Sequence, residues 1–254
     1  MRRAESVARR YGQVMSKFEP MDESWSRGLA IVAHPDDLEY GASAAIARWT
    51  AQGKEISYCL ATRGEAGIDA MHPDEVGPLR EAEQRASAAI VGVHDVEFLD
   101  HADGTIEYGL PLRRDIARAV RRYRPDVVIS ANHHDTWGPG FLNQADHIAV
   151  GRAVLDGVRD AGNRWVFREL LDEGLEPWSA HRVFVTGSPQ SAHAVDVTDS
   201  FEKGVASLEA HAEYLRGLGN HPMADAREFL EANARRVGSQ LGCTFAAAFE
   251  VISL

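Results

Sequence analysis

The sequence of 254 residues contains little cysteine and no long apolar segment. Its two cysteines, Cys59 and Cys243, are isolated, which excludes a disulfide framework and a cysteine-based zinc finger. No apolar run approaches the roughly 20 residues that a membrane-spanning helix needs. The first 16 residues also lack the apolar centre of a signal peptide. We therefore expect a cytoplasmic protein without a membrane partner.

Positive charge is also scarce. The chain has 27 Lys and Arg against 38 Asp and Glu, which gives a net charge of −11. Because no basic patch appears, we expect no nucleic-acid partner. The Gly-x-Gly-x-x-Gly fingerprint is missing after the first apolar strand, which disfavours a dinucleotide site. The expected partner is a small molecule, and a homo-oligomer is compatible with these properties.

Apolar strand-like runs alternate with amphipathic helical patterns along most of the chain. This alternation predicts right-handed βαβ units and a Rossmann-like α/β fold: a doubly wound, mostly parallel sheet with helices on both faces, in three layers. We expect one domain over residues 1–254, with residues 1–27 as a helical N-terminal arm. The predicted strands are 29–33, 56–61, 96–99, 127–131, 183–187 and 194–197, and the predicted helices are 42–52, 79–91, 112–123, 147–158 and 201–215.

The most informative residues follow the first apolar strand. His34, Asp36 and Asp37 stand within four positions at its carboxyl end, where open α/β sheets bind ligands. Carboxylates held this close repel one another unless a cation joins them. Pro35 is suited to the start of a helix, which would place Asp36 and Asp37 in the first turn. The pattern predicts a metal site and hence an enzyme.

A second metal-binding pair, Asp146 and His147, follows the strand 127–131 and a glycine-rich loop and opens the next helix. Both groups therefore lie at the same edge of the sheet. His34, Asp37 and His147 would supply two imidazoles and one carboxylate and leave a position for water, as in catalytic zinc sites. Singly, the aspartates are as compatible with helix caps. Because these residues occur together after two strand ends, we favour a metal site over helix caps.

The pattern His34-Pro35-Asp36-Asp37-x-Glu39, followed at a distance by Asp146-His147, resembles the PIG-L/LmbE-like family of zinc-dependent de-N-acetylases. The resemblance implies a hydrolase that removes the acetyl group from an N-acetylglucosaminyl-type substrate and releases acetate and a free amine. It extends through most of the chain in shorter motifs: Thr62 to Gly67, Arg80-x-x-Glu83, Asp103-Gly104 and Arg124-Pro125-Asp126.

The resemblance also implies roles for individual residues. His34, Asp37 and His147 would bind one Zn²⁺ per chain, with Fe²⁺ as the alternative under reducing conditions. Asp36 would be the general base, because it stands next to a ligand without being one. Asp146 would orient a ligand histidine.

Five further residues are candidates for substrate binding. Arg80 and Asp103 fall where the family contacts its sugar, although Arg80 could pair with a neighbouring glutamate and Asp103-Gly104 is also a turn signal. Arg63 and Glu65 belong to a loop at the same sheet edge and could line the pocket or pair with each other. Trp137 could stack on a sugar ring or pin its own loop.

One position departs from the family pattern. Many members carry a histidine three residues before the ligand histidine, where this chain has Gln144. A neutral amide donates a hydrogen bond but not a proton. Either Gln144 supports the oxyanion while Asp36 acts as both base and acid, or His133, His134 or a substrate group supplies what is missing.

Two other functions compete with the deacetylase. A magnesium-dependent phosphoesterase could use the same acidic pair, with His133, His134 and Asp135 as further ligands. The sequence offers it neither a phosphate-binding glycine loop nor a lysine clamp. A catalytically inactive sugar-binding homologue is the second alternative, and Gln144 is the residue that favours it.

Overall fold

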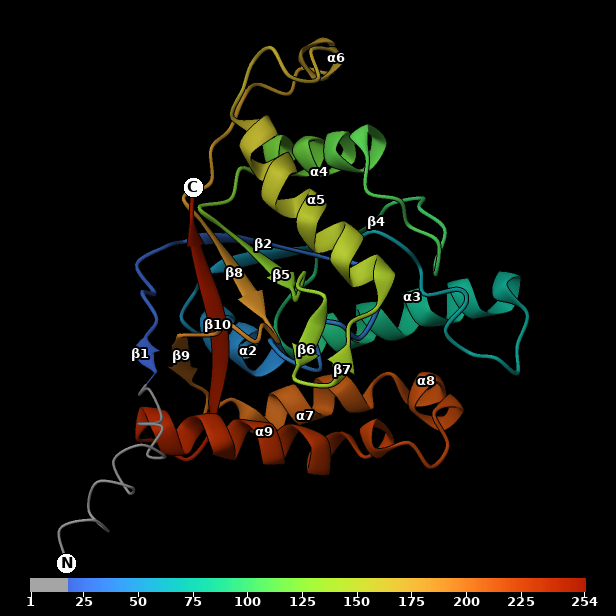
Figure 1. Ribbon diagram of the computed structural model, residues 1–254, viewed down its shortest axis with the longest axis vertical. Helices are drawn as coiled ribbons and strands as arrows, with labels where there is room; N and C mark the ends of the chain where they lie inside the picture. The colour runs from blue at the N-terminus through green and yellow to red at the C-terminus, as the bar shows by residue number, and fades with distance from the viewer. Residues whose placement is uncertain (1–17) are drawn as a thin grey trace, which may run out of the picture.

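The computed structural model describes residues 18–254, which build an 8-stranded sheet and a short hairpin (Figure 1). The strand order in the sheet is β1-β9-β10-β8-β5-β2-β3-β4. Its strands are β1 (Glu19–Pro20), β2 (Arg27–Val32), β3 (Glu55–Leu60), β4 (Val96–Phe98), β5 (Val127–Ala131), β8 (Arg182–Thr186), β9 (His193–Asp196) and β10 (Ala246–Ser253). The hairpin consists of β6 (Thr136–Gly138) and β7 (Phe141–Leu142).

Helices cover both faces of the sheet. Figure 1 shows α4 and α5 together on one side of the strands and α7 and α9 together on the other. The helices are α2 (Ser43–Ala51), α3 (Pro73–Ile90), α4 (Leu110–Tyr123), α5 (Ala145–Ala161), α6 (Glu169–Asp172), α7 (Phe201–Glu209), α8 (Ala212–Gly217) and α9 (Ala226–Leu241), with a 3₁₀ turn η1 at Pro222–Ala224.

The strands are apolar on both faces because the sheet is the middle layer. Successive strand residues point to opposite sides. In β2, Leu29 and Ile31 join the core formed with α4 and α5, whereas Ala30 and Val32 join the core formed with α2. This confirms the predicted three-layer architecture with helices on both faces.

The pairing of the strands confirms a mostly parallel sheet. The neighbours β2–β3, β2–β5, β3–β4 and β5–β8 are parallel, and β10 runs antiparallel between β8 and β9. From β2 the chain proceeds outward through β3 and β4 and then returns to add β5 and β8 on the other side. The carboxyl ends of β2 and β5 therefore flank the point where the winding reverses, which is where such folds bind ligands.

The structure corrects the sequence prediction in three places. Residues 1–17 of the predicted arm lie outside the described part, and within 18–27 a strand, Glu19–Pro20, pairs with β9 where a helix was expected. The predicted helix 42–52 is confirmed by α2, but no helix begins at Pro35, and the predicted helix 201–215 is divided into α7 and α8. The single-domain organisation stays a prediction. Among residues 18–254, every helix is too short or too polar to cross a membrane.

Candidate metal centre

The loop between β2 and α2 turns its two aspartates to different partners. Residues 35–42 form consecutive turns, and Asp36 has a φ of 88°, a left-handed conformation that is strained for a residue with a Cβ. The Asp36 N–H donates to Gln84 Oε1 at 3.1 Å. Asp37 Oδ2 accepts from the N–H groups of Ala33 at 3.0 Å and His34 at 2.9 Å. The predicted position of both aspartates in a first helical turn is therefore wrong.

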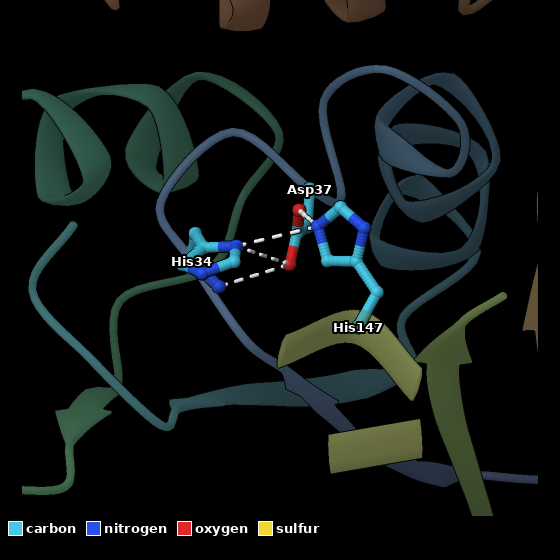
Figure 2. A group of neighbouring side chains, drawn as sticks. All are labelled: His34, Asp37 and His147. Atoms are coloured by element: carbon cyan, nitrogen blue, oxygen red, sulfur yellow. Dashed lines mark hydrogen bonds and ion pairs between the residues drawn. The ribbon is translucent and has the colours of Figure 1, made fainter. Parts of the chain in front are cut away.

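Three metal-binding side chains, two from the loop after β2 and one from the first turn of α5, point toward one another (Figure 2). His147 Nε2 lies 2.9 Å from Asp37 Oδ1 and 3.3 Å from His34 Nδ1, and His34 Nδ1 lies 3.7 Å from Asp37 Oδ2. Ligands of a tetrahedral zinc ion at about 2.1 Å are separated by roughly 3.4 Å. The spacing of this group, His34, Asp37 and His147, therefore fits a single small cation.

The outer nitrogens of both imidazoles are already paired with oxygen acceptors. His34 Nε2 lies 3.0 Å from Asp103 Oδ1 and 3.2 Å from Asp146 Oδ2, and His147 Nδ1 lies 3.0 Å from Asn143 Oδ1. Protons on these outer nitrogens leave lone pairs on the two inner ones, which face each other and a carboxylate. Three acceptors that converge in this way can share a cation, as metal-binding histidines do.

The electrostatics of the centre point the same way. Burial opposes the charging of His34, but Asp103, Asp146 and Asp37 together raise its pKa well above the ordinary value. Burial likewise acts to raise the pKa of Asp37, yet His147 and His34 hold it far below the usual range. The centre therefore gathers more carboxylate than imidazole and attracts positive charge.

Asp36 lies beside this centre without contacting its histidines. Its side chain is buried, and Arg80 Nη2 lies 3.3 Å from Asp36 Oδ1. Burial raises the pKa of Asp36, as does the neighbouring Asp37, whereas Arg80 and a hydrogen bond from Tyr214 lower it. Arg80 is itself buried, donates to the carbonyl oxygen of Pro35 and stacks 4.0 Å from the centre of the Tyr214 ring. Its contacts hold the loop that carries Asp36, and its predicted sugar contact stays a prediction.

A cleft of about 1270 Å³ opens over the metal centre. Its volume is somewhat above the roughly 300–1,000 Å³ of ordinary ligand pockets, so it has room for more than one sugar ring. Its lining combines His34, Asp36, Asp37, Gln144 and His147 with residues of the C-terminal helices, among them Tyr214, Met223, Phe229 and Arg236.

The remaining predicted site residues fall into two groups. Asp103, Gln144 and Trp137 line the cleft, and the Trp137 ring stands edge-on to His147 with 5.6 Å between centroids. Arg63 and Glu65 are absent from the lining that residues 18–254 form. Arg63 pairs with Asp100 at 3.0 Å, and Glu65 accepts from the backbone N–H groups of Arg63 and Asp103.

The two histidines considered as proton donors also lie outside the cleft lining. His134 Nε2 is 2.8 Å from Glu250 Oε2, and His133 stacks on His134 with 4.3 Å between ring centroids. Neither belongs to the His34, Asp37 and His147 group. Gln144 was considered for stabilising the oxyanion, and His133 and His134 for replacing the missing histidine. Of these three residues, only Gln144 lines the cleft that the described residues form.

Three residues of the site were not predicted from the sequence. Gln84 Oε1 accepts from the Asp36 N–H, and Asn143 Oδ1 pairs with His147 Nδ1. Tyr214 lines the cleft and packs on Arg80, the partner of Asp36. Gln84 stands four residues after Arg80 and thus on the same helical face, a spacing that could have indicated it. Tyr214 carries no comparable signal in the sequence.

Comparison with known proteins places these residues in context. The profile of the family described as PIG-L, GlcNAc-PI de-N-acetylase, matches residues 29–158, just over half of the chain. This stretch contains His34, Asp37 and His147.

Three curated relatives show how far the similarity extends. The chain is 29% identical over 185 residues to a diacetylchitobiose deacetylase of Thermococcus kodakarensis, covering 72% of the chain and 68% of the relative. It is 30% identical over 137 residues to a probable N-acetyl-alpha-D-glucosaminyl L-malate deacetylase 2 of Bacillus anthracis, covering 51% and 58%. It is 25% identical over 201 residues to a 1D-myo-inositol 2-acetamido-2-deoxy-alpha-D-glucopyranoside deacetylase of Thermomonospora curvata, covering 68% and 64%. The matches thus span about two thirds or less of each relative.

Solved structures share the fold. The N,N'-diacetylchitobiose deacetylase of Pyrococcus horikoshii superposes with a TM-score of 0.80 at 24% identity, covering 98% of this chain and 92% of the other. The conserved protein TT1542 of Thermus thermophilus superposes with a TM-score of 0.72 at 26% identity, covering 89% and 93%. These superpositions support the doubly wound α/β architecture.

Proposed function

The chain belongs to the PIG-L family of GlcNAc-PI de-N-acetylases, and from this premise we propose that it is a metal-dependent hydrolase that removes the acetyl group from an N-acetylated amino sugar. The products are acetate and a free amine. One observation carries the proposal: the donor atoms of His34, Asp37 and His147 converge at the base of a cleft that also exposes Asp36. The names of the three curated relatives, each a deacetylase of an N-acetylated amino sugar, support the substrate class.

The donor set indicates which metal the centre binds. Two imidazole nitrogens and one carboxylate are ligands that zinc favours, and Fe²⁺ is the alternative. When bound, zinc supplies a Lewis acid that activates water and polarises the amide carbonyl. The carboxylate and amide oxygens beside the outer nitrogens of His34 and His147 can accept their protons, which favours the tautomer that such an ion requires.

Asp36 is the residue we assign as general base. Its carboxylate interacts with Arg80 and Tyr214 rather than with the two ligand histidines. It is therefore free to accept the proton of the attacking water and to return it to the leaving amine. The family pattern described above has a histidine where this chain has Gln144. Because a neutral amide cannot give up a proton, we assign both steps to Asp36.

Gln144 and Trp137 act on the substrate. Gln144 stands at the amino end of α5 with an exposed side chain at the cleft. Its amide N–H can donate a hydrogen bond to the oxygen on which negative charge develops. Trp137 is 42% exposed and lines the same cleft, which suits stacking on a sugar ring.

Acetate release from a panel of substrates tests the proposal. The full chain is assayed with diacetylchitobiose and with N-acetylglucosaminyl inositol and malate after loading with Zn²⁺ or, without oxygen, Fe²⁺, and after chelation. We expect release with at least one substrate, its loss on chelation and its return on reloading. Sugar binding without acetate release under any of these conditions would instead identify an inactive homologue. Magnesium-dependent cleavage of phosphate esters would identify the phosphoesterase.

A further inference from the structure

A second group of metal-binding side chains lies outside the cleft, and we propose that it binds one additional divalent cation of the zinc type. The group, which we call the β10 cluster, consists of His133, His134 and Glu250. One donor atom from each of them lies within 4.8 Å of the others. In the part of the chain that the structure describes, none of them belongs to the first metal centre or lines the cleft. This inference does not depend on the proposed deacetylase activity.

Two elements that are far apart in the sequence bring the β10 cluster together. His133 and His134 follow β5 after Asn132, and Glu250 stands within β10, opposite Val185 of β8. His134 Nε2 lies 2.8 Å from Glu250 Oε2, and the ring centroids of His133 and His134 are 4.3 Å apart. All three residues are partly buried, so their side chains are held without being closed to solvent.

The side chains of the β10 cluster are of the types that bind zinc. Two imidazoles and one carboxylate are ligands that this ion favours in proteins, and they bind it in their deprotonated forms.

An ion pair between His134 and Glu250 does not account for the whole group. Ser188 Oγ already donates to Glu250 Oε2 at 2.6 Å, so this carboxylate is satisfied without His133. His133 Nδ1 is nevertheless buried and has no hydrogen-bond partner among residues 18–254. A buried polar nitrogen without a partner is costly, and a cation shared with His134 and Glu250 gives the His133 imidazole a role.

The β10 cluster is also linked to the first metal centre through the backbone. Asn143 Nδ2 donates to the carbonyl oxygens of Asn132 at 2.8 Å and His134 at 2.9 Å, and Asn143 Oδ1 faces His147 Nδ1. A cation bound to the cluster would fasten the 132–143 loop to β10 and thereby restrain the residue that orients His147. We therefore expect this cation to restrict the motion of Asn143 and so of His147 in the first metal centre.

Metal stoichiometry of the full chain tests this site. Wild-type protein equilibrated with excess Zn²⁺, or with Co²⁺ as a spectroscopic probe, and freed of unbound ions should hold two ions per chain. His133→Ala should hold one, and it removes no side-chain hydrogen bond of the described residues, so the fold should survive. Glu250→Gln is the second variant, since a glutamine can still accept from Ser188. His94→Ala, which changes an exposed histidine remote from both groups, should still hold two.

The first centre provides an internal reference. His147→Ala should lose the ion of that centre and keep the ion of the β10 cluster, so failure of one site is distinguishable from failure of the other. A wild-type protein that binds one ion per chain under these conditions overturns the proposal. So does a second ion that persists in folded His133→Ala and Glu250→Gln, because it must then lie elsewhere.

Discussion

At the scale of single residues, Asp36 and Asp37 are neighbours whose carboxylates meet different partners. Asp37 is held between His34 and His147, and Asp36, in a left-handed conformation, contacts Arg80. The proximity of His34, Asp37 and His147 in space could be predicted from the sequence, because parallel strands end at one sheet edge. The left-handed conformation of Asp36 could not be predicted, because Pro35 followed by two aspartates is equally typical of a helix start.

Replacing Asp36 tests its assignment as general base. Asp36→Asn should lower kcat by about 10²–10⁴-fold, the usual contribution of general acid–base catalysis. Asparagine tolerates the left-handed conformation, so the loop should keep its shape. Bound metal, measured by elemental analysis, should equal the wild-type content, whereas Asp37→Asn should lose an ion. Retention of most of the activity in Asp36→Asn would refute the role.

Gln84 is predicted to be a positioning residue for Asp36. It accepts from the Asp36 N–H at 3.1 Å and donates to Glu39 Oε1 at 2.8 Å, and it is buried. Gln84→Leu leaves the Asp36 N–H without a buried acceptor, which costs about 1–3 kcal/mol. We expect kcat to fall about tenfold or more with little change in KM, since the substrate contacts are intact.

The matched control for this change is Gln52→Leu, which alters an exposed glutamine at the end of α2. It should leave kcat and KM at their wild-type values. A purely structural role for Gln84 would lower the melting temperature of Gln84→Leu while kcat of the folded protein stayed unchanged, and that result would contradict the prediction.

At the scale of elements, sequence periodicity located β2, β5 and α5, which position the metal centre, but it missed β6, β7, β10 and α9, which also line the cleft. β10 begins with Ala246–Ala248, and alanine is depleted in strands, so its propensity signal is weak. β1, β6 and β7 span two or three residues each, which is too short for any period to appear. Antiparallel β10 completes the sheet through tertiary pairing that local sequence does not encode.

Asp126 is predicted to fasten the two strands that carry the site. It directly precedes β5, and its Oδ2 accepts from the N–H groups of Ser26 and Arg27 at the start of β2, both at 2.9 Å. Asp126→Asn should lower the free energy of unfolding at pH 7 by about 1 kcal/mol, a modest value because the group is largely solvated. Urea unfolding of the variant and the wild type measures this difference.

The contribution of Asp126 should depend on pH. Although burial opposes it, the N–H groups of Arg27 and Ser26 lower the pKa of Asp126 in the folded state, and the charge of Arg27 lowers it further. A lowered folded-state pKa stabilises the fold above the unfolded value of about 3.9, and this stabilisation is lost as the pH falls through the folded value. The difference between Asp126→Asn and the wild type should therefore be constant from about pH 5 to 7 and shrink below about pH 4. A difference that is equal at pH 3 and pH 7 would contradict this account.

At the scale of the whole molecule, the alternating strand and helix pattern was sufficient to predict a doubly wound sheet, because βαβ units are right-handed and close on a parallel sheet. The point where the winding reverses follows from the spatial strand order, which the pattern alone leaves open. That order places β2 beside β5 and so joins residues 113 positions apart, as His34 and His147 are. The cleft depends further on α8 and α9, of which α9 was not predicted.

Because the first metal centre joins these two distant segments, its ion should stabilise the whole fold. A ligand that binds only the native state at about a thousandfold above its Kd adds roughly 4 kcal/mol, which in a domain of this size corresponds to roughly 8–16 °C in melting temperature. We expect the protein to melt that much higher in a buffer that holds free Zn²⁺ about a thousandfold above the Kd of this centre than in a chelator, as measured by differential scanning calorimetry. His147→Ala should lose most of this response, whereas His94→Ala should retain it. An equal response to Zn²⁺ in His147→Ala and the wild type would show that the stabilising ion binds elsewhere, and the three converging donors would then have no cation to explain their arrangement.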